Sequence, residues 1–418
     1  MLDPDYIRNN PELVKQNAKN KNIQVDIDQF LKLDKRVRQL QKQIDKLRQE
    51  RNIISKQNVT KELISKAKKL KNKIQQLEKE LKQLREEREK ILVTIPNVVY
   101  PEVPVGKDES GNQEIRRWGK VSEFDFKPKS HIQLAEKWDL IDFERGSKVS
   151  GYRGYFLKNE LAVLHLALLW FAFTKLIAKG YTPIIAPAIV KEFTLFGCGQ
   201  FPWGRRETYE LNDNDSFLAG TAEQPVTSYF AGEILEEKNL PYKFVAFSPC
   251  YRREAGSYGK DTRGVYRVHE FYKIEQVIIS TADDDQARQL HEELQNNTEE
   301  IWQELNLPYR VLLMCTGDMG EPQAKKYDTE VWMPYRKGWG EVASNSIMTD
   351  FQSRRLNIKY RAKDNSSKYV YTLNDTALPS PRALIAIIEN YQQSDSTIKV
   401  PDVLQKFTGF DTIPSGKF

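Results

Sequence analysis

The chain has 418 residues, more than one ordinary hydrophobic core needs, so two domains are expected, one of them large. Residues 1–100 carry 24 basic and 14 acidic side chains, a net charge of +10 against +6 for the whole chain, which suggests a polyanionic partner or, more plainly, a solvated helix surface. The three cysteines and four histidines show no CxxC or HExxH spacing, which argues against a disulfide framework or a protein-built zinc site and favours the cytoplasm.

The first residues have neither the basic flank nor the apolar run of a signal peptide. Asn10, Pro11 and Glu12 have the N-cap, the first-turn proline and the acid of a helix start, so a short helix is predicted there. The most apolar run, at 161–174, is too short to span a bilayer. It is predicted to be a buried helix in the core or at a subunit interface, and no membrane association is expected.

A long antiparallel helical hairpin is predicted at about residues 28–95. Its apolar residues recur at alternating steps of three and four, as in a coiled coil, and the pattern is interrupted at Arg51 and Arg88. Residues 55–61 lack the pattern, so the chain should reverse there. The seam residues are Phe30, Leu33, Val37, Leu40, Ile44, Leu47 and Ile54, then Leu63, Ala67, Leu70, Ile74, Leu77, Leu81, Leu84, Ile91 and Ile95.

Basic side chains lie off this seam, where they are free to meet phosphates. Each arm would be on the order of 40 Å long at about 1.5 Å per residue. From this pattern alone the hairpin could be a scaffold, a dimerisation coil or a nucleic-acid-binding arm. The basic residues are Arg36, Arg38, Lys42, Lys46, Arg48, Lys66, Lys68, Lys69 and Lys73.

Prolines and glycines between residues 96 and 111 indicate a linker, so the predicted domains are 1–105 and 106–418. In the second domain a short polar loop between two strands favours an antiparallel sheet, and the predicted fold class is α+β. The chain contains no GxGxxG or GxxxxGK[ST] motif of a dinucleotide fold or a P-loop. Helices are predicted at 161–178, 283–305 and 381–391, and strands at 243–247, 265–279 and 369–373.

The segment Tyr251–Gly264 (YRREAGSYGKDTRG) joins two of these strands and combines three glycines with several cations. Guanidinium groups held by rigid strands can grip a phosphate-bearing ligand. Arg252 and Glu254 stand two residues apart, which would place them on one strand face. A solvent-exposed, salt-bridged hairpin is the alternative.

The run YRREAGSYGKDTRGVYRVHEFYKIEQV resembles motif 2 of class II aminoacyl-tRNA synthetases, in the form found in the seryl-tRNA synthetase family. Pro187 in GYTPIIAPAIV is similar to the motif 1 proline, and NDTALPSPRALIAIIENYQ resembles motif 3 with its arginine at Arg382. Further matches are TAEQP, FGCGQFP, CTGDMGEPQAKKYDTEVWMP and DFQSRRLNIKYR, and the resemblance covers the chain from its first residues to its tail. The sequence departs from the commoner family pattern at Ile347, Asp375, Ala377 and Pro381.

This resemblance implies a coiled-coil hairpin followed by a class II catalytic domain, built on an antiparallel β-sheet flanked by helices. It also implies a cytoplasmic homodimer that uses ATP and Mg²⁺ to convert L-serine to seryl-adenylate. The seryl group would pass to the 3′ end of tRNA(Ser), with tRNA(Sec) as a further candidate acceptor. The hairpin would bind the long variable arm of the tRNA.

The resemblance also implies roles for single residues. Arg252 would hold the α-phosphate and the serine carboxylate, and Arg382 the γ-phosphate; with Glu275 they are the predicted catalytic residues. The implied ATP-binding residues are Arg252, Arg253, Glu254 (on the adenine amino group), Val268, His269, Glu270, Phe271 (stacked on adenine), Glu341, Val342, Ala343, Ser344 and Arg382, with Mg²⁺ on Glu341 and Ser344. The implied serine-binding residues are Thr221 and Glu223 (on the ammonium), Ala222, Arg252, Asn374, and Glu275 with Thr376 (on the hydroxyl).

Two other functions are compatible with a synthetase-like chain. A paralogue that adenylates an amino acid for a carrier protein would tend to lack the long hairpin. A non-catalytic RNA-binding relative or assembly scaffold should have lost the ATP-binding charges, yet Arg252, Glu254, Glu275 and Arg382 are all present. Ser344 and Thr376 could instead be small polar residues that cap or fill.

Overall fold

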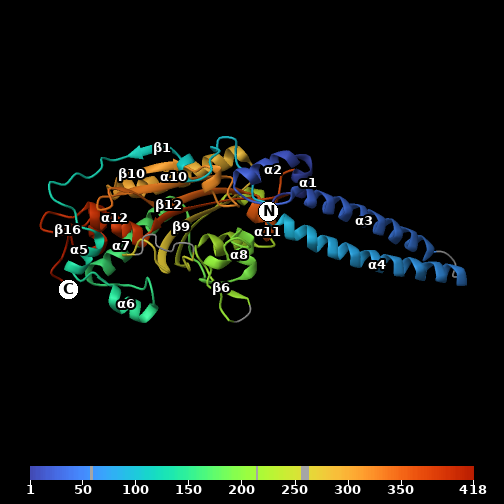
Figure 1. Ribbon diagram of the computed structural model, residues 1–418, viewed down its shortest axis with the longest axis horizontal. Helices are drawn as coiled ribbons and strands as arrows, with labels where there is room; N and C mark the ends of the chain where they lie inside the picture. The colour runs from blue at the N-terminus through green and yellow to red at the C-terminus, as the bar shows by residue number, and fades with distance from the viewer. Residues whose placement is uncertain (57–59, 213–214, 256–262) are drawn as a thin grey trace. The chain divides into compact units, whose positions relative to one another are not determined.

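The computed structural model describes residues 1–56, 60–212, 215–255 and 263–418, and the chain divides into two compact units, Met1–Pro96 and Asn97–Phe418 (Figure 1). The described part of the first unit is helical, and the strands described below all belong to the second. The predicted α+β fold class is confirmed.

The first unit begins with two short helices that precede the hairpin. Asn10 stands before the second of them, as predicted, but its amide donates to the carbonyl oxygen of Tyr6 at 3.0 Å and does not cap the helix. The first helix was not predicted, because six residues are too few to show a period. The four helices are α1 (Pro4–Asn9), α2 (Pro11–Asn20), α3 (Ile27–Ile54) and α4 (Lys61–Leu92).

Helices α3 and α4 run side by side and confirm the predicted hairpin (Figure 1). Asp26 and Thr60 cap their N-termini through side-chain oxygens. The seam is buried around Val37 to Ile44 and only partly buried from Leu63 to Leu70, and residues 57–59 of the predicted turn lie outside the described residues. The second arm ends as a helix at Leu92, so Ile95, predicted to belong to it, is instead buried just beyond its end.

The seam position taken by Arg88 has a polar partner on the facing helix. Asp34 of α3 is fully buried, and its carboxylate lies 3.2 Å from Nη1 of Arg88. The same carboxylate lies 2.9 Å from Nη1 of Arg8 in α1 and 3.0 Å from Nε of Arg38. One buried anion therefore joins three helices at the base of the hairpin.

The second unit is organised around one eight-stranded sheet, in which neighbours pair antiparallel except for β4 with β8. The strand order is β1 (Gln113–Trp118), β10 (Tyr309–Leu313), β11 (Lys325–Met333), β12 (Gly338–Thr349), β15 (Tyr371–Pro379), β9 (Glu270–Ser280), β8 (Tyr242–Tyr251) and β4 (Thr182–Ile185). Smaller sheets pair β14 (Ser367–Tyr369), β13 (Lys359–Arg361) and β7 (Ile234–Glu236); β2 (Ile141–Asp142) and β3 (Phe156–Leu157); β5 (Ile189–Lys191) and β6 (Ser216–Leu218); and β16 (Ile398–Lys399) and β17 (Thr412–Ile413).

The strands of the pair β8 and β9 differ in their bounds from the sequence prediction, and the first of them ends at Tyr251 rather than at Phe247. The second strand begins at Glu270 rather than at Val265, because residues 263–269 form turns and bends. The connection therefore covers residues 252–269 rather than the predicted 248–264, and its residues 256–262 lie outside the described part of the chain. Strand β1 follows directly after the predicted linker of residues 96–111, and it was not predicted.

Helices α7, α10 and α12 pack against the sheet and form with it the main hydrophobic core. Contrary to the prediction that the apolar run is too short to span a bilayer, helix α7 is long and apolar enough by length and composition to do so, and half of its apolar window is buried within this unit. The helices of this unit are α5 (His131–Lys137), α6 (Phe143–Ser150), α7 (Asn159–Ala178), α8 (Glu192–Cys198), α9 (Glu223–Thr227), α10 (Asp284–Glu304), α11 (Phe351–Leu356), α12 (Ser380–Asn390) and α13 (Asp402–Thr408).

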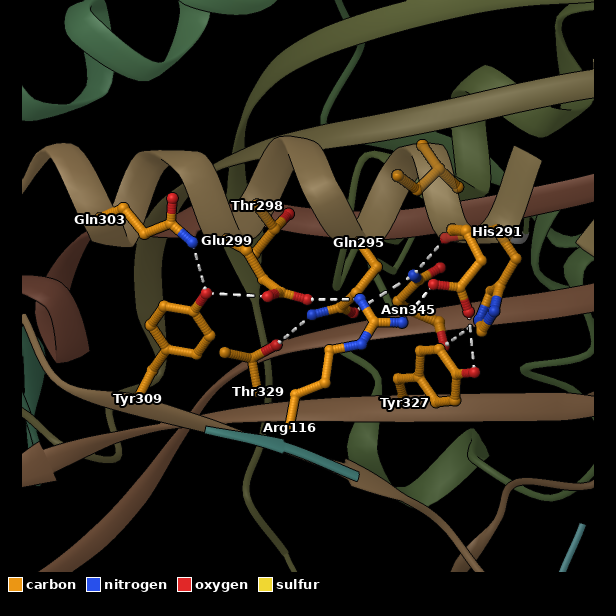
Figure 2. Close-up of polar contacts among 12 residues, drawn as sticks. Arg116, His291, Gln295, Thr298, Glu299, Gln303, Tyr309, Tyr327, Thr329 and Asn345 are labelled. Carbon is orange, nitrogen blue, oxygen red and sulfur yellow. Dashed lines mark hydrogen bonds and ion pairs between the residues drawn. The ribbon is translucent and has the colours of Figure 1, made fainter. Parts of the chain in front are cut away.

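Beside these apolar contacts, a row of polar side chains also joins α10 to the sheet (Figure 2). Arg116 of β1 donates to the carboxylate of Glu299 at 2.8 Å, and the hydroxyl of Tyr309 donates to the same carboxylate at 2.8 Å. Gln295 donates to the hydroxyl of Thr329 at 3.0 Å. Because buried polar groups need matched partners, this layer fixes how α10 lies along the strands.

Candidate active site

A polar pocket of about 240 Å³ lies over the centre of the large sheet. The period of two along β9 directs Phe271, Lys273 and Glu275 to the same face of the sheet, and all three line the pocket. In β15, Asn374 and Thr376 line it in the same way, and Thr376 is the register partner of Glu275. The amide nitrogen of Asn374 is buried without a hydrogen-bond partner among the described residues, so it is free to donate to a ligand.

One end of the pocket holds two carboxylates, the half-buried Glu223 at the start of α9 and the buried Glu275. Gln352 of α11 donates from Nε2 to Glu223 at 2.7 Å, and Thr372 donates to the oxygen of the same amide at 2.6 Å, so the orientation of Gln352 is fixed. Burial, and then the nearby charge of Glu275, raise the pKa of Glu223 to about 7. This end is therefore suited to a ligand that carries a positive charge.

Lys273 connects the groups at this end. Its ammonium lies 2.8 Å from the hydroxyl of Thr221 and 3.1 Å from that of Thr376, and it forms an ion pair with Glu275. The hydroxyl of Thr376 in turn donates to Oε2 of Glu275 at 3.1 Å.

The other end of the pocket is lined by arginines. Arg252 follows directly after β8 and donates from Nε to the carbonyl oxygen of Gly220 at 3.1 Å. Its guanidinium lies 5.2 Å from the ring centroid of Phe271. Arg382, near the start of α12, donates from Nη1 to the carbonyl oxygen of Glu341 at 2.7 Å and lies 3.3 Å from its carboxylate. Fixed guanidinium groups of this kind suit phosphate oxygens and carboxylates.

Glu341 and Ser344 of β12 line the pocket beside Asp328 of β11, whose register partner is Ser344. Burial favours a higher pKa for Glu341, but the positive charges of Arg382 and Lys326 outweigh it and hold the pKa below its usual value. Burial raises the pKa of Asp328 to about 6, and its Oδ1 has no hydrogen-bond partner among the described residues.

These oxygens could hold a divalent cation only together with a ligand. The described residues contain no cluster of three or more acidic, histidine or cysteine side chains of metal-binding geometry. Mg²⁺ is commonly held by one or two carboxylates together with substrate phosphates, and the arrangement of Glu341 with Ser344 fits that donor set.

The prediction that Glu254 and Arg252 share one face of a strand is wrong. Strand β8 ends at Tyr251, and Glu254 has a left-handed backbone with φ of +51°. Its carboxylate nevertheless reaches the pocket, where it lies 3.1 Å from Nη1 of Arg267. Both predicted side chains therefore meet in the pocket, although a turn rather than a strand places them there.

Most of the predicted site residues meet in this pocket: Thr221, Glu223, Arg252, Glu254, Val268, Phe271, Glu275, Glu341, Val342, Ala343, Ser344, Asn374, Thr376 and Arg382. Four others do not line it. Ala222 is buried at the start of α9, the amide of Arg253 donates to the carbonyl oxygen of Glu207, and His269 and Glu270 line a different hollow. Sequence reasoning missed Tyr266, Arg267, Lys273, Gln323, Ser346 and Pro379.

Most of the departures from the family pattern point away from this pocket. Asp375 stands between two pocket residues in β15, so its side chain lies on the opposite face, where Thr298 of α10 donates to Oδ2 at 2.7 Å. Burial raises the pKa of Asp375 well above its usual value. Ile347 and Ala377 are buried in the core, and only Pro381 of the four lines the pocket.

Both units match described domain families. Residues 1–99 match the seryl-tRNA synthetase N-terminal domain, and residues 207–391 match the tRNA synthetase class II core domain (G, H, P, S and T). A serine–tRNA ligase of Pyrococcus furiosus is 45% identical over 446 residues, covering 99% of this chain and 97% of that protein.

Two solved structures are also similar. The crystal structure of seryl-tRNA synthetase from Pyrococcus horikoshii complexed with ATP has a TM-score of 0.93 and 42% identity, and covers 99% of both chains. The cytoplasmic serine–tRNA ligase from Naegleria fowleri in complex with AMP has a TM-score of 0.88 and 32% identity, and covers 98% of this chain and 96% of that one.

Proposed function

We propose, because the chain belongs to the seryl-tRNA synthetase family, that its pocket binds ATP and L-serine together and joins them as seryl-adenylate. The reaction is that of a serine–tRNA ligase, in which serine is activated with ATP and transferred to tRNA. The observation that carries the assignment to this pocket is that the carboxylates of Glu223 and Glu275 and the guanidinium groups of Arg252 and Arg382 line the same pocket. Of the alternatives, a carrier-protein ligase is not favoured because the hairpin is present, and a non-catalytic relative is not favoured because the pocket keeps its charges.

The arginines hold the reacting groups in line. Arg252 binds the α-phosphate and the serine carboxylate, which brings the attacking oxygen to the phosphorus, and Arg382 binds the γ-phosphate. Glu254 accepts from the adenine amino group, and Phe271 stacks on the base. Catalysis then follows from orientation and from neutralised phosphate charge, with little proton transfer by side chains.

The carboxylate end selects the amino acid. Glu223 binds the ammonium, and Glu275 with Thr376 accepts the hydroxyl hydrogen of serine. Alanine would leave Glu275 buried without that partner, at a cost of about 1–3 kcal/mol.

We propose Glu341 and Ser344 as the residues that hold Mg²⁺ together with ATP. The ion would supply positive charge against the phosphates. This proposal is supported by the unpartnered carboxylate oxygen of Asp328 beside them and by the low pKa of Glu341, which keeps that carboxylate ionised.

We assign tRNA(Ser) binding to the hairpin α3–α4, because lysines and arginines stand exposed along both helices. A rod of this kind suits recognition of RNA shape and phosphates rather than of bases. We also propose a cytoplasmic homodimer. Large apolar side chains of α7 and of the segments that follow it are exposed in the single chain, and a second copy would cover them; they are Leu166, Trp170, Ile185, Ile189 and Phe193.

Pyrophosphate exchange into ATP tests the activation step. The purified protein is expected to catalyse this exchange when serine is present and not with alanine or threonine. Absence of exchange with serine, or equal exchange with the other two amino acids, would refute the assignment.

A further inference from the structure

Lys273 is a buried cation in the middle of β9 that has no role in the function proposed above. Its side chain is 5% exposed and forms part of the pocket wall. Removing an ammonium from water is costly unless every donor is engaged. A cation kept inside a substrate pocket therefore calls for an explanation beyond packing.

The three hydrogens of the ammonium match three acceptors on three segments. These are the hydroxyl of Thr221 in the loop before α9 at 2.8 Å, the hydroxyl of Thr376 in β15 at 3.1 Å, and the carboxylate of Glu275 in β9 itself. One side chain thus fixes the relative positions of the groups around the amino-acid end of the pocket.

These contacts also set the direction of two hydroxyl groups. The oxygen of Thr221 accepts from Lys273 and from the backbone N–H of Glu223 at 3.3 Å, so its hydrogen is left to donate. The hydroxyl of Thr376 accepts from Lys273 and donates to Glu275. An ammonium group carries donors only, so Thr221 in this arrangement is directed at an oxygen of the substrate rather than at its ammonium.

Lys273 also sets the charge of this end of the pocket. Glu223 and Glu275 contribute two carboxylates, half-buried and buried, and Lys273 cancels the charge of one of them through its ion pair with Glu275. The positive charge of Lys273 is one of the influences that lower the pKa of Glu223 against the effects of burial and of Glu275. The other charged and titratable groups around Glu223 and Lys273 are Glu275, Asp375, Arg252, Cys198 and Cys250.

We propose that Lys273 is a positioning residue for serine: it aligns the hydroxyls of Thr221 and Thr376 with Glu275 and leaves one net negative charge for the substrate ammonium. This inference rests on the proposed serine-activating function of the pocket. Lys273 contacts Thr221, Thr376 and Glu275 at the amino-acid end of the pocket, so its effect is expected on the affinity and the choice of amino acid.

The test compares Lys273→Met, which removes the charge and the donors, with Lys273→Arg, which keeps the charge, in serine-dependent pyrophosphate exchange from pH 6 to 9. Lys273→Met is expected to raise the KM for serine on the order of 100-fold, because it leaves buried acceptors and a charge unpaired. Its KM for ATP should stay within about threefold of that of the unmodified protein, since the substitution removes no group proposed to bind ATP. The pH midpoint of the serine KM should move upward from about 7 in Lys273→Met and stay in place in Lys273→Arg.

Lys243→Met is the matched control, because Lys243 on the adjacent strand pairs with Glu293 and does not line the pocket. It should leave both parameters unchanged. If Lys273→Met failed to fold, Thr376→Val would serve, with a serine KM raised about tenfold and an unchanged midpoint.

The proposal is overturned if Lys273→Met leaves the serine KM, the midpoint and the preference for serine over alanine as they are in the unmodified protein. It is also overturned if ATP affinity falls as much as serine affinity, or if Thr376→Val shifts the midpoint. An unmodified protein without serine-dependent exchange would refute the proposed function instead, so the two failures are distinguishable.

Discussion

The guanidinium of Arg382 lies over the ring of Tyr266, with 4.5 Å between Cζ and the ring centroid. Nε of Arg382 also donates to the carbonyl oxygen of Tyr266 at 3.3 Å. The ring and the carbonyl together hold the planar group in one orientation, so that it needs little reorganisation when a phosphate arrives.

Arg382→Lys is therefore expected to lower the rate of serine-dependent pyrophosphate exchange by about 100-fold or more. An ammonium has neither the paired N–H donors of the planar guanidinium nor its stacking on the Tyr266 ring. Tyr266→Leu should have a smaller effect, of about tenfold. Arg336 lies 5.0 Å from the same ring but is exposed and does not line the pocket, so Arg336→Lys is the control. Near-normal exchange by Arg382→Lys would contradict the phosphate role.

The pKa of Glu223 predicts how serine binding depends on pH. Because burial and Glu275 raise this pKa to about 7, the carboxylate is largely protonated below pH 7 and cannot pair with an ammonium. The KM for serine should therefore fall as pH rises, by up to about tenfold per unit below pH 7, and level off above it. Steady-state exchange at pH 6 to 8 measures this dependence.

Glu223→Gln is the companion variant, since it cannot titrate. Its serine KM should be high and nearly constant over the same pH range. A pH-independent KM in the unmodified protein would mean that Glu223 does not bind the ammonium.

The hairpin lysines should affect tRNA and leave activation unchanged. Lys66, Lys69 and Lys73 are exposed on α4, and replacing all three by glutamate should weaken tRNA binding and flatten its salt dependence by about 2–3 in the logarithmic slope. Filter binding between 50 and 300 mM salt measures the slope. Pyrophosphate exchange should be unchanged, and Lys399→Glu in the other unit is the control for added negative charge. Equal loss of both activities would show that the hairpin is structural.

Deleting residues 30–95 is a coarser form of the same experiment. Activation of serine should persist while transfer to tRNA is lost. Loss of activation as well would argue that the second unit depends on the hairpin for its fold.

The exposed apolar residues of α7 predict the oligomeric state. Trp170 is 55% exposed and Leu166 is 65% exposed in the single chain, so Trp170→Asp should place a charge in the proposed dimer interface. Sedimentation equilibrium should then find a monomer where the unmodified protein is a dimer. Tyr335→Asp, at another exposed aromatic residue, is the control. A monomeric unmodified protein would refute the dimer.

Sequence reasoning succeeded where a pattern is regular or a motif is long. The heptad spacing located α3 and α4, and the motif around Arg252 and Glu275 identified residues that do meet in one pocket. Strand β1 was missed because six residues at an edge, half exposed, carry little periodic signal.

Lys273 was missed for a different reason. Its partners Thr221 and Thr376 lie 52 and 103 residues away in the chain, and a lone lysine within a strand gives no sign of them. Glu254 was assigned to a strand because the alternating pattern gives no indication of a residue with positive φ. In the structure Glu254 has such a positive φ, and the chain turns there.

The buried carboxylate of Asp34 sets the alignment of the two hairpin arms. Heptad seams are nearly self-similar, so sliding one helix by seven residues would still place apolar side chains against apolar ones. Such a slide would exchange Arg88 for Leu81 or Ile95 opposite Asp34 and remove one of the three arginine partners of this buried anion. The hairpin therefore has a favoured alignment and a tip at a constant distance from its base, so that, as the proposed tRNA-binding arm, it would present its basic side chains at fixed spacings along the RNA.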